Sequence, residues 1–301
     1  MPAALSTWTD LGGGIRVRQS RAYAMNSALL LHPEHAIVVD PGVLPSELDD
    51  LRRAVEEASP RQVTLFLTHA HWDHVLGRPW WPKARLIAHD RFGAEVRRDR
   101  ARILDEAGRL AAAYGETWTA GFAPFAPDEA VSGLRFATLG PWRAVWRDAP
   151  GHCDSQLSLH LPESRTLFAA DMLSDIEIPE LNRPPAVYRA TLEALLPLAE
   201  HGAIETLVPG HGGIASDAGE VRARLRRDLD YLDALEAGVR EARRQGLALE
   251  ATQERLAAVE LAVGEPGAMA GIHRGNVEIA YQEPTVHGGA QSRARRSDVP
   301  P

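Results

Sequence analysis

The stretch Thr68-His69-Ala70-His71-Trp72-Asp73-His74 decides the fold, because it places four potential metal ligands within six residues. It directly follows Val63–Leu67, a short and mostly apolar run that predicts a strand covered on both faces. On a helix, side chains spaced this tightly would scatter around the axis, whereas a loop after a strand can turn them into one pocket. Histidine nitrogens with an aspartate oxygen suit zinc, and also iron or manganese. We therefore interpret the pattern H-x-H-x-D-H as a metal site rather than as a polar loop that happens to contain three histidines.

Three isolated residues further along the chain could complete such a site. His152 and His211 each follow a Pro-Gly pair, which fixes the turn, and Asp171 ends the apolar run Leu167–Ala170. All three fall at or just after the end of a predicted strand, where functional residues are often placed. Each alone would be an ordinary loop residue. Together with the cluster they provide enough ligands for two metal ions and a carboxylate to bridge them.

These motifs resemble the metallo-β-lactamase superfamily, and the match runs from about Asn26 to Gly213. The H-x-H-x-D-H signature, the Pro-Gly-His, the final Gly-His and the strand-terminal aspartate all match, as does the upstream turn Val38–Gly42. The resemblance implies an α/β (α+β) fold, an αββα sandwich with the site at one edge of its two sheets. It also implies seven ligands: His69, His71 and His152 for the first metal, Asp73, His74 and His211 for the second, and Asp171 as the bridge between them.

The chemistry of such a site follows from two closely spaced cations. Cations ~3.5–4 Å apart can share a water and lower its pKa toward neutrality, which produces a hydroxide nucleophile at pH 7. One metal also polarises a substrate carbonyl and takes the negative charge of the tetrahedral intermediate. The implied enzyme is a hydrolase with two Zn²⁺ per chain, or iron or manganese in their place, in which Asp73 and Asp171 are the catalytic carboxylates. Its small-molecule substrate would be a thioester, a lactone, an ester or a β-lactam.

Three other functions compete with this interpretation. A phosphodiesterase or nuclease could use the same ligands, but the net charge of −8 and the single lysine, Lys83, count against a nucleic-acid partner. A persulfide dioxygenase would bind one iron and leave Asp73, His74 and His211 underused as ligands. A binding module on a hydrolase fold would have lost ligands, and none is lost here.

The composition narrows the cellular setting. With 45% hydrophobic and 25% charged residues, the 301-residue chain is typical of a soluble globular protein. Cys153 is the single cysteine, so the chain can form neither an internal disulfide nor a cysteine-based zinc knuckle. No stretch approaches the roughly 18–20 apolar residues of a membrane span, and the first residues do not resemble a signal peptide. We expect a cytoplasmic protein without a membrane partner, and a homodimer is an option.

We expect three regions along the chain. They are a catalytic domain over 1–216, a C-terminal helical extension packed on it over 217–283, and a disordered tail over 284–301. An apolar stripe from Val221 to Val239 predicts one long helix, whose charged residues fit its solvated face and whose apolar face could line the pocket. A second helix is predicted over Leu249–Val263 and a short element over His273–Glu283.

Five residues near the predicted ligands have roles that the pattern leaves open. Asp40 could accept a hydrogen bond from a ligand histidine and fix its orientation, or it could only cap its own turn. We expect Trp72 to pack under the metal loop, while Trp80 and Trp81 could either wall the pocket or pack elsewhere. For Tyr188 we expect packing rather than substrate contact.

Overall fold

The computed structural model describes residues 7–258, 263, 264 and 266–283. The predicted tail over 284–301 lies outside the described residues, as does part of the region predicted as the helix Leu249–Val263.

The first layer is a seven-stranded mixed sheet in which the strands follow one another in sequence order. Its strands are β1 (Thr7–Gly12), β2 (Ile15–Gln19), β3 (Asn26–Leu30), β4 (Ala36–Val39), β5 (Val63–Phe66), β6 (Arg85–His89) and β7 (Glu129–Val131). The pairs from β1 to β4 are antiparallel and those from β4 to β7 are parallel. The apolar runs Ala28–Leu31 and Ala36–Val39 predict a hairpin, which β3 and β4 form, whereas the sequence pattern does not indicate β1 and β2.

The second layer is a five-stranded sheet with the order β12-β11-β10-β9-β8. Its strands are β8 (Arg135–Leu139), β9 (Trp142–Asp148), β10 (Leu157–Leu161), β11 (Thr166–Phe168) and β12 (Thr206–Val208). Only β11 and β12 run parallel, and the helix α3 (Pro185–Glu200) connects them. Parallel neighbours leave the sheet at the same edge, so the residues that follow β11 and β12 start side by side.

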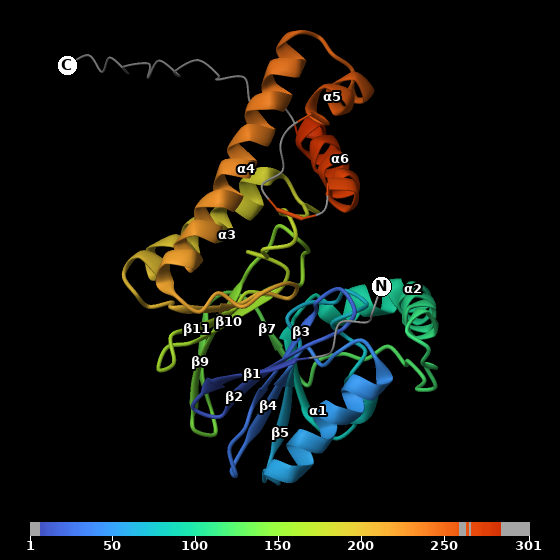
Figure 1. The fold of residues 1–301 in the computed structure, drawn as a ribbon, viewed down its shortest axis with the longest axis vertical. Helices are drawn as coiled ribbons and strands as arrows, with labels where there is room; N and C mark the ends of the chain where they lie inside the picture. The colour runs from blue at the N-terminus through green and yellow to red at the C-terminus, as the bar shows by residue number, and fades with distance from the viewer. Residues whose placement is uncertain (1–6, 259–262, 265, 284–301) are drawn as a thin grey trace, which may run out of the picture.

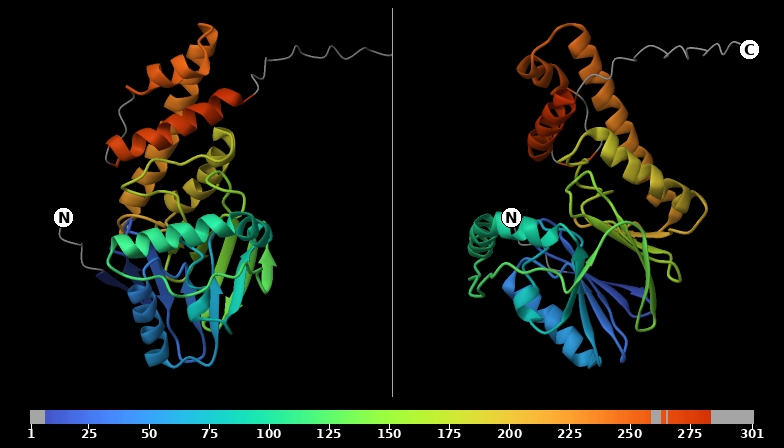
Figure 2. Two further views of the ribbon diagram at one scale, coloured as in Figure 1. Left: turned by 90° about the vertical axis from the view of Figure 1, so that its right-hand side faces the viewer. Right: turned by 180° about the vertical axis from the view of Figure 1, so that it is seen from behind.

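Apolar side chains from both sheets fill the space between them, including Phe66 and Ile87 from the first and Trp146 and Leu159 from the second. The outer face of the first sheet is covered by α1 (Pro45–Ala58) and α2 (Phe92–Ala113). The outer face of the second sheet is covered by α3 and α4 (Ala218–Arg244). Helices therefore lie outside two stacked sheets, and the predicted αββα sandwich is confirmed (Figures 1 and 2).

One predicted helix start is wrong. The sequence predicts a helix over Ser46–Ala58 with Ser46 as its N-cap, but α1 begins one residue earlier, at Pro45, and its N-cap residue Leu44 provides no side-chain hydrogen bond. Proline is favoured in the first turn because its missing N–H has no helical partner there. The Ser46 hydroxyl instead donates a hydrogen bond to Glu116 (2.7 Å).

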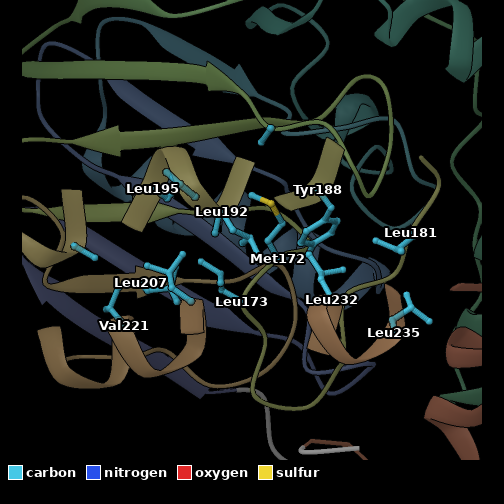
Figure 3. Packing of buried hydrophobic residues seen from close by; sticks show 14 of the residues in the cluster. Met172, Leu173, Leu181, Tyr188, Leu192, Leu195, Leu207, Val221, Leu232 and Leu235 are labelled. Carbon is cyan, nitrogen blue, oxygen red and sulfur yellow. The ribbon is translucent and has the colours of Figure 1, made fainter. Parts of the chain in front are cut away.

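The C-terminal helices differ in length from their prediction. The apolar stripe does form one long helix, α4, and its side chains are buried against α3, β11 and β12 (Figure 3). The next helix, α5, covers only Leu249–Leu256, and α6 begins at Pro266, well before the predicted short element. Two charged residues of α4, Arg224 and Asp228, are buried rather than solvated, which contradicts the expected polar face. None of the described helices is both long and apolar enough to cross a membrane.

Candidate metal centre

Four chain segments bring the predicted ligands to one edge of the sandwich. The loop after β5 carries His69 to His74, and the connection from β9 to β10 carries His152. Asp171 follows β11, and His211 follows β12. Because β11 and β12 are parallel with Phe168 opposite Val208, the chain delivers these last two side chains to the same place.

The seven predicted residues form two adjacent groups whose potential ligand atoms lie within 4.8 Å of one another in each group. The first group is His69, His71, His152 and Asp171, and the second is Asp73, His74 and His211. Within the first group, the Nδ1 atom of His71 lies 2.9 Å from the Nε2 atom of His152. Each group therefore has a donor set of the type that binds a divalent cation.

The carboxylate of Asp171 lies between the two groups. Its Oδ2 atom is 3.3 Å from the Nε2 atoms of both His69 and His152. Its Oδ1 atom is 3.1 Å from the Nε2 atom of His74, in the second group. The Oδ2 atom is also 3.7 Å from His211. One carboxylate thus faces histidines of both groups.

Three of the histidines are held by their other ring nitrogen. The Nδ1–H group of His69 donates to the Thr68 hydroxyl (3.0 Å), because that hydroxyl itself donates to Asp40 (2.6 Å). The Nδ1–H group of His74 donates to Asp40 (3.0 Å). That of His211 donates to the backbone oxygen of Tyr23 (3.0 Å). In neutral rings of this tautomer, each Nε2 atom presents a lone pair toward the pocket.

In this neutral tautomer the lone pairs of His69 and His74 point at the carboxylate of Asp171, which is itself an acceptor. The partners of these atoms therefore indicate whether metal ions fit the site. The Nε2 atoms of His69 and His74 and the Oδ1 atom of Asp171 are buried and have no hydrogen-bond partner among the described residues. Buried polar atoms normally have partners. A divalent cation between each nitrogen and carboxylate would satisfy both atoms, so the residues present fit the metal ions that the family pattern implies.

The pKa values follow from burial and from the two carboxylates. Burial lowers the pKa of His69 to about 4, so this ring is neutral at pH 7. Burial also disfavours a charged His211, but Asp171 and Asp73 outweigh it and raise the pKa of His211 to about 10. For His74, the same balance against Asp171, Asp73 and Asp40 raises the pKa well above its ordinary value. The negative charge that favours a proton on these rings would equally attract a divalent cation.

Asp40, the residue after β4, contacts the metal loop through Thr68 and His74. Besides His74, it accepts hydrogen bonds from the backbone N–H (2.7 Å) and the hydroxyl of Thr68. Its backbone has φ = 43°, a left-handed conformation that costs energy for a residue with a side chain. The structure therefore brings Asp40 into contact with a candidate ligand, as one of the two alternatives from the sequence requires.

Gly210, directly before His211, lies where the structure leaves no room for a side chain. A Cβ atom at this position would lie 2.0 Å from the Oδ1 atom of Asp171 and 3.1 Å from the ring of His74. Any side chain here would displace the central carboxylate, so the close approach of the backbone requires glycine.

A pocket of about 250 Å³ opens over the two groups. Its apolar walls are Tyr23, Trp72, Met172, Ile178, Pro179, Tyr188 and Ile272. Its charged lining besides the ligands is Arg102, Glu106, Glu177 and Glu180. The pocket can accept an apolar group beside the metal site, and acidic side chains predominate around it.

The tryptophans near the site divide between the pocket and the core. Trp72 lines the pocket, edge-on to Tyr23 at 6.1 Å, in addition to packing against the core. Trp80 and Trp81 do not line it: Trp80 donates a hydrogen bond to Asp49 (2.8 Å) on α1, and Trp81 is buried in the core beneath. Their position after the metal loop suggests proximity to the pocket, but the short helix Arg78–Trp80 lies against α1.

The remaining wall comes from places that carry no sequence motif. The apolar face of α4 is buried in the core, so the expectation that it lines the pocket is wrong. Its place is taken by Ile272 of α6 and by the segment around Ile178. Tyr188 is fully buried in the cluster shown in Figure 3, as expected for a packing residue, and it also lines the pocket.

The fold and the ligand pattern together define a metal-dependent hydrolase. A model of the metallo-beta-lactamase superfamily matches residues 21–232, and the chain belongs to this family. The match extends beyond β12 into α4.

Two curated relatives share the family core at low identity. The acyl-coenzyme A thioesterase MBLAC2 of Homo sapiens is 25% identical over 222 residues, which cover 67% of this chain and 79% of the relative. The Gallus gallus protein of the same name is 24% identical over 220 residues, covering 67% and 78%.

Solved structures show the same fold. The stereoselective inverting sec-alkylsulfatase Pisa1 from Pseudomonas sp. aligns over 92% of this chain with a TM-score of 0.71 at 15% identity, and this chain spans about half (50%) of its length. The metallo-beta-lactamase from Pontibacter korlensis aligns over 74% of this chain and 99% of its own, with a TM-score of 0.52 at 14% identity.

Proposed function

We propose that this protein is a dinuclear metal hydrolase that cleaves a small acyl substrate, with thioesters as the preferred class. His69, His71 and His152 would hold the first metal, and Asp73, His74 and His211 the second. Asp171 would bridge the two. Zinc suits this donor set, and iron or manganese are alternatives.

One observation carries the proposal: a single carboxylate, that of Asp171, faces histidine nitrogens of both groups at 3.1–3.3 Å, and buried atoms on both sides lack hydrogen bonds. When bound, two divalent cations would supply an activated water and a Lewis acid for the substrate carbonyl. The chain's own part is to hold these cations through rings whose orientation Thr68, Asp40 and Tyr23 fix.

The pocket residues would bind and orient the substrate. Asp73 and Asp171 both reach the pocket, so their carboxylates are placed to orient an attacking water and to take its proton. The apolar walls formed by Trp72, Met172 and Ile272 suit an acyl chain and would exclude bulk water from it.

The charges of the pocket lining favour acyl substrates over phosphodiesters. Of the described lining residues, Arg102 is the one with a guanidinium group, and Glu106 is already paired with Arg109 (2.7 Å). Glu177 and Glu180 make no ion pair with an arginine or a lysine among the described residues. Such a lining repels an anionic reacting group, which disfavours a phosphodiester. The names of the two curated relatives favour thioesters among the acyl substrates.

The test is a substrate panel. Hydrolysis of short-chain acyl thioesters of N-acetylcysteamine, of lactones and of aryl acetates is compared with that of bis-(4-nitrophenyl) phosphate. We expect turnover of the carbonyl substrates, with thioesters cleaved most efficiently, and little phosphodiester hydrolysis.

Two controls connect the activity to the site: protein stripped with a chelator, and the His71→Ala variant. Both should lose the activity. Phosphodiester rates well above every carbonyl rate, and lost in both controls, would contradict the proposal and support the nuclease alternative.

A further inference from the structure

Two charged side chains on α4 are buried without any part in the proposed chemistry. Arg224 is 4% exposed and Asp228 is 1% exposed, although the helix periodicity alone would place charged residues at its surface. Burying a charge is costly unless hydrogen bonds and an opposite charge compensate for it. The hydrogen-bond partners of Arg224 and Asp228 therefore indicate the role of these two side chains.

Arg224 joins two ligand-bearing segments. Its Nη1 atom donates to the backbone oxygen of Leu173 (3.2 Å), two residues after Asp171. The same atom donates to the backbone oxygen of Gly213 (2.8 Å), two residues after His211. The opposite side of its guanidinium group is paired with Glu220 on the same helix. One side chain thus fixes the exits of both segments.

The next turn of α4 adds two further contacts to the segment after Asp171. Arg227 donates to the backbone oxygen of Ser174 (2.6 Å) and also to the carboxylate of Asp228 (2.7 Å). Asp228 in turn accepts a hydrogen bond from the backbone of Leu173. Three residues of α4, Arg224, Arg227 and Asp228, therefore hold the backbone at residues 173 and 174.

The backbone that these contacts hold is strained. Ala170 has φ = 53° and Leu173 has φ = 63°, so Asp171 lies between two residues in the left-handed region. Residues with a side chain stay in this region only where surrounding contacts impose it. Ala170 is held by Gly210, whose N–H donates to its backbone oxygen (2.6 Å), and Leu173 is held by α4.

Asp175 contacts both the segment after His211 and Arg224 on α4. Its Oδ1 atom accepts a hydrogen bond from the N–H of Gly213 (2.6 Å), and its Oδ2 atom lies 3.6 Å from Arg224. A Cβ atom at Gly212 would lie 2.2 Å from the same Oδ1 atom, so the segment after His211 passes very close to it.

We propose that Arg224 is a positioning residue for the metal centre, acting through the strained backbone on both sides of Asp171 and through the segment after His211. This inference rests on the proposed function, because Asp171 and His211 matter in this way only as metal ligands. Arg224 touches neither ligand side chain. Its hydrogen bonds hold the segment after β11 and the segment after β12 in a fixed position relative to each other.

The experiment compares Arg224→Met with Arg226→Met. Arg226 lies on the same helix but is exposed, with one ion pair to Glu200 (3.4 Å), so it controls for the loss of a charge. The Zn²⁺ affinity of each purified variant is measured by competition with a chromophoric chelator, and urea unfolding is measured with chelator present. We expect Arg224→Met to bind one of its two zinc ions at least about tenfold more weakly, as for loss of an outer-shell partner. Arg226→Met should match the original chain, and Arg224→Lys should be intermediate.

The outcomes separate this inference from the proposed function. If the original chain binds neither zinc, iron nor manganese, the proposed function fails and this inference with it. If the original chain binds two zinc ions and Arg224→Met binds both with unchanged affinity, only this inference fails, even if its stability in chelator is reduced. If Arg224→Met does not fold, Asp175→Ala replaces it, because Asp175 is exposed and contacts the same segment. Unchanged zinc affinity in Asp175→Ala would then overturn the inference.

Discussion

The metal loop 68–74 and the segment 170–175 supply ligand candidates to the same pocket, but they are held in different ways. The loop carries four candidates and is fixed by its own first residue, Thr68, and by Asp40, which directly follows β4. The segment carries one candidate, Asp171, and is fixed by α4, whose Arg224 is 51 residues away from its partner Leu173. Ligands that are close in sequence can thus depend on local support, while a lone central ligand depends on a distant helix.

The largest expected effect comes from the centre of the segment. Asp171→Ala removes a negative charge that both metal groups would share, so it should weaken metal retention as well as turnover. The loss should exceed the roughly 10–100-fold cost of removing an outer-shell partner. Asp171→Asn keeps the shape without the charge and should be nearly as damaging. Full metal content and most of the activity in Asp171→Ala would show that Asp171 is not a bridge.

The two metal groups can be separated by removing one ligand from each. His211→Ala should leave the first group intact, and its bound metal should fall to close to one equivalent per chain. His152→Ala should remove the metal of the first group and leave the second group intact, because Asp171 is the one ligand candidate that both metals would share. Elemental analysis of both variants checks this. A variant that loses both equivalents or none would contradict the division into two groups.

Asp40 tests the local support of the metal loop. Because it accepts the Nδ1–H group of His74, Asp40→Ala should cost about 10–100-fold in metal affinity or activity. Zinc competition and kcat/KM report the effect, and Asp50→Ala on α1 is a matched surface control. Unchanged affinity and rate, with reduced thermal stability only, would favour a turn-capping role.

The smallest expected effect is at the tryptophans beside the loop. Trp80→Phe should leave kcat/KM unchanged, because its ring faces Asp49 and Trp118 rather than the pocket. Trp72→Ala should raise KM for acyl substrates, because that ring lines the pocket. Steady-state kinetics of both variants on one thioester check these two expectations. A changed KM in Trp80→Phe would contradict the assignment of Trp80 to a position outside the pocket.

The ligand candidates could be predicted from the sequence because their order along the chain is a motif. Strands β1 and β2 could not, because Thr7–Gly12 does not alternate between apolar and polar residues and the alternation over Ile15–Arg18 is only four residues long. The role of Trp72 depends on the direction in which a loop turns, which spacing does not show.

The contacts between α4 and the segment after Asp171 could not be predicted from the sequence for a different reason. On a helix with an apolar stripe, Arg224 and Asp228 fit a solvated face, and only the fold shows that the segment after Asp171 covers them. The strain at Ala170 and Leu173 is equally invisible, because neither residue type signals a left-handed backbone. Long-range hydrogen bonds to the backbone leave no pattern in a single sequence.

The most direct test of the central claim is the metal content of the unaltered protein. Seven protein ligands are too many for one tetrahedral zinc ion. Protein purified without chelator and analysed by inductively coupled plasma mass spectrometry should therefore contain close to two metal equivalents per chain. One equivalent, together with unchanged metal content in His74→Ala and His211→Ala, would contradict the dinuclear site.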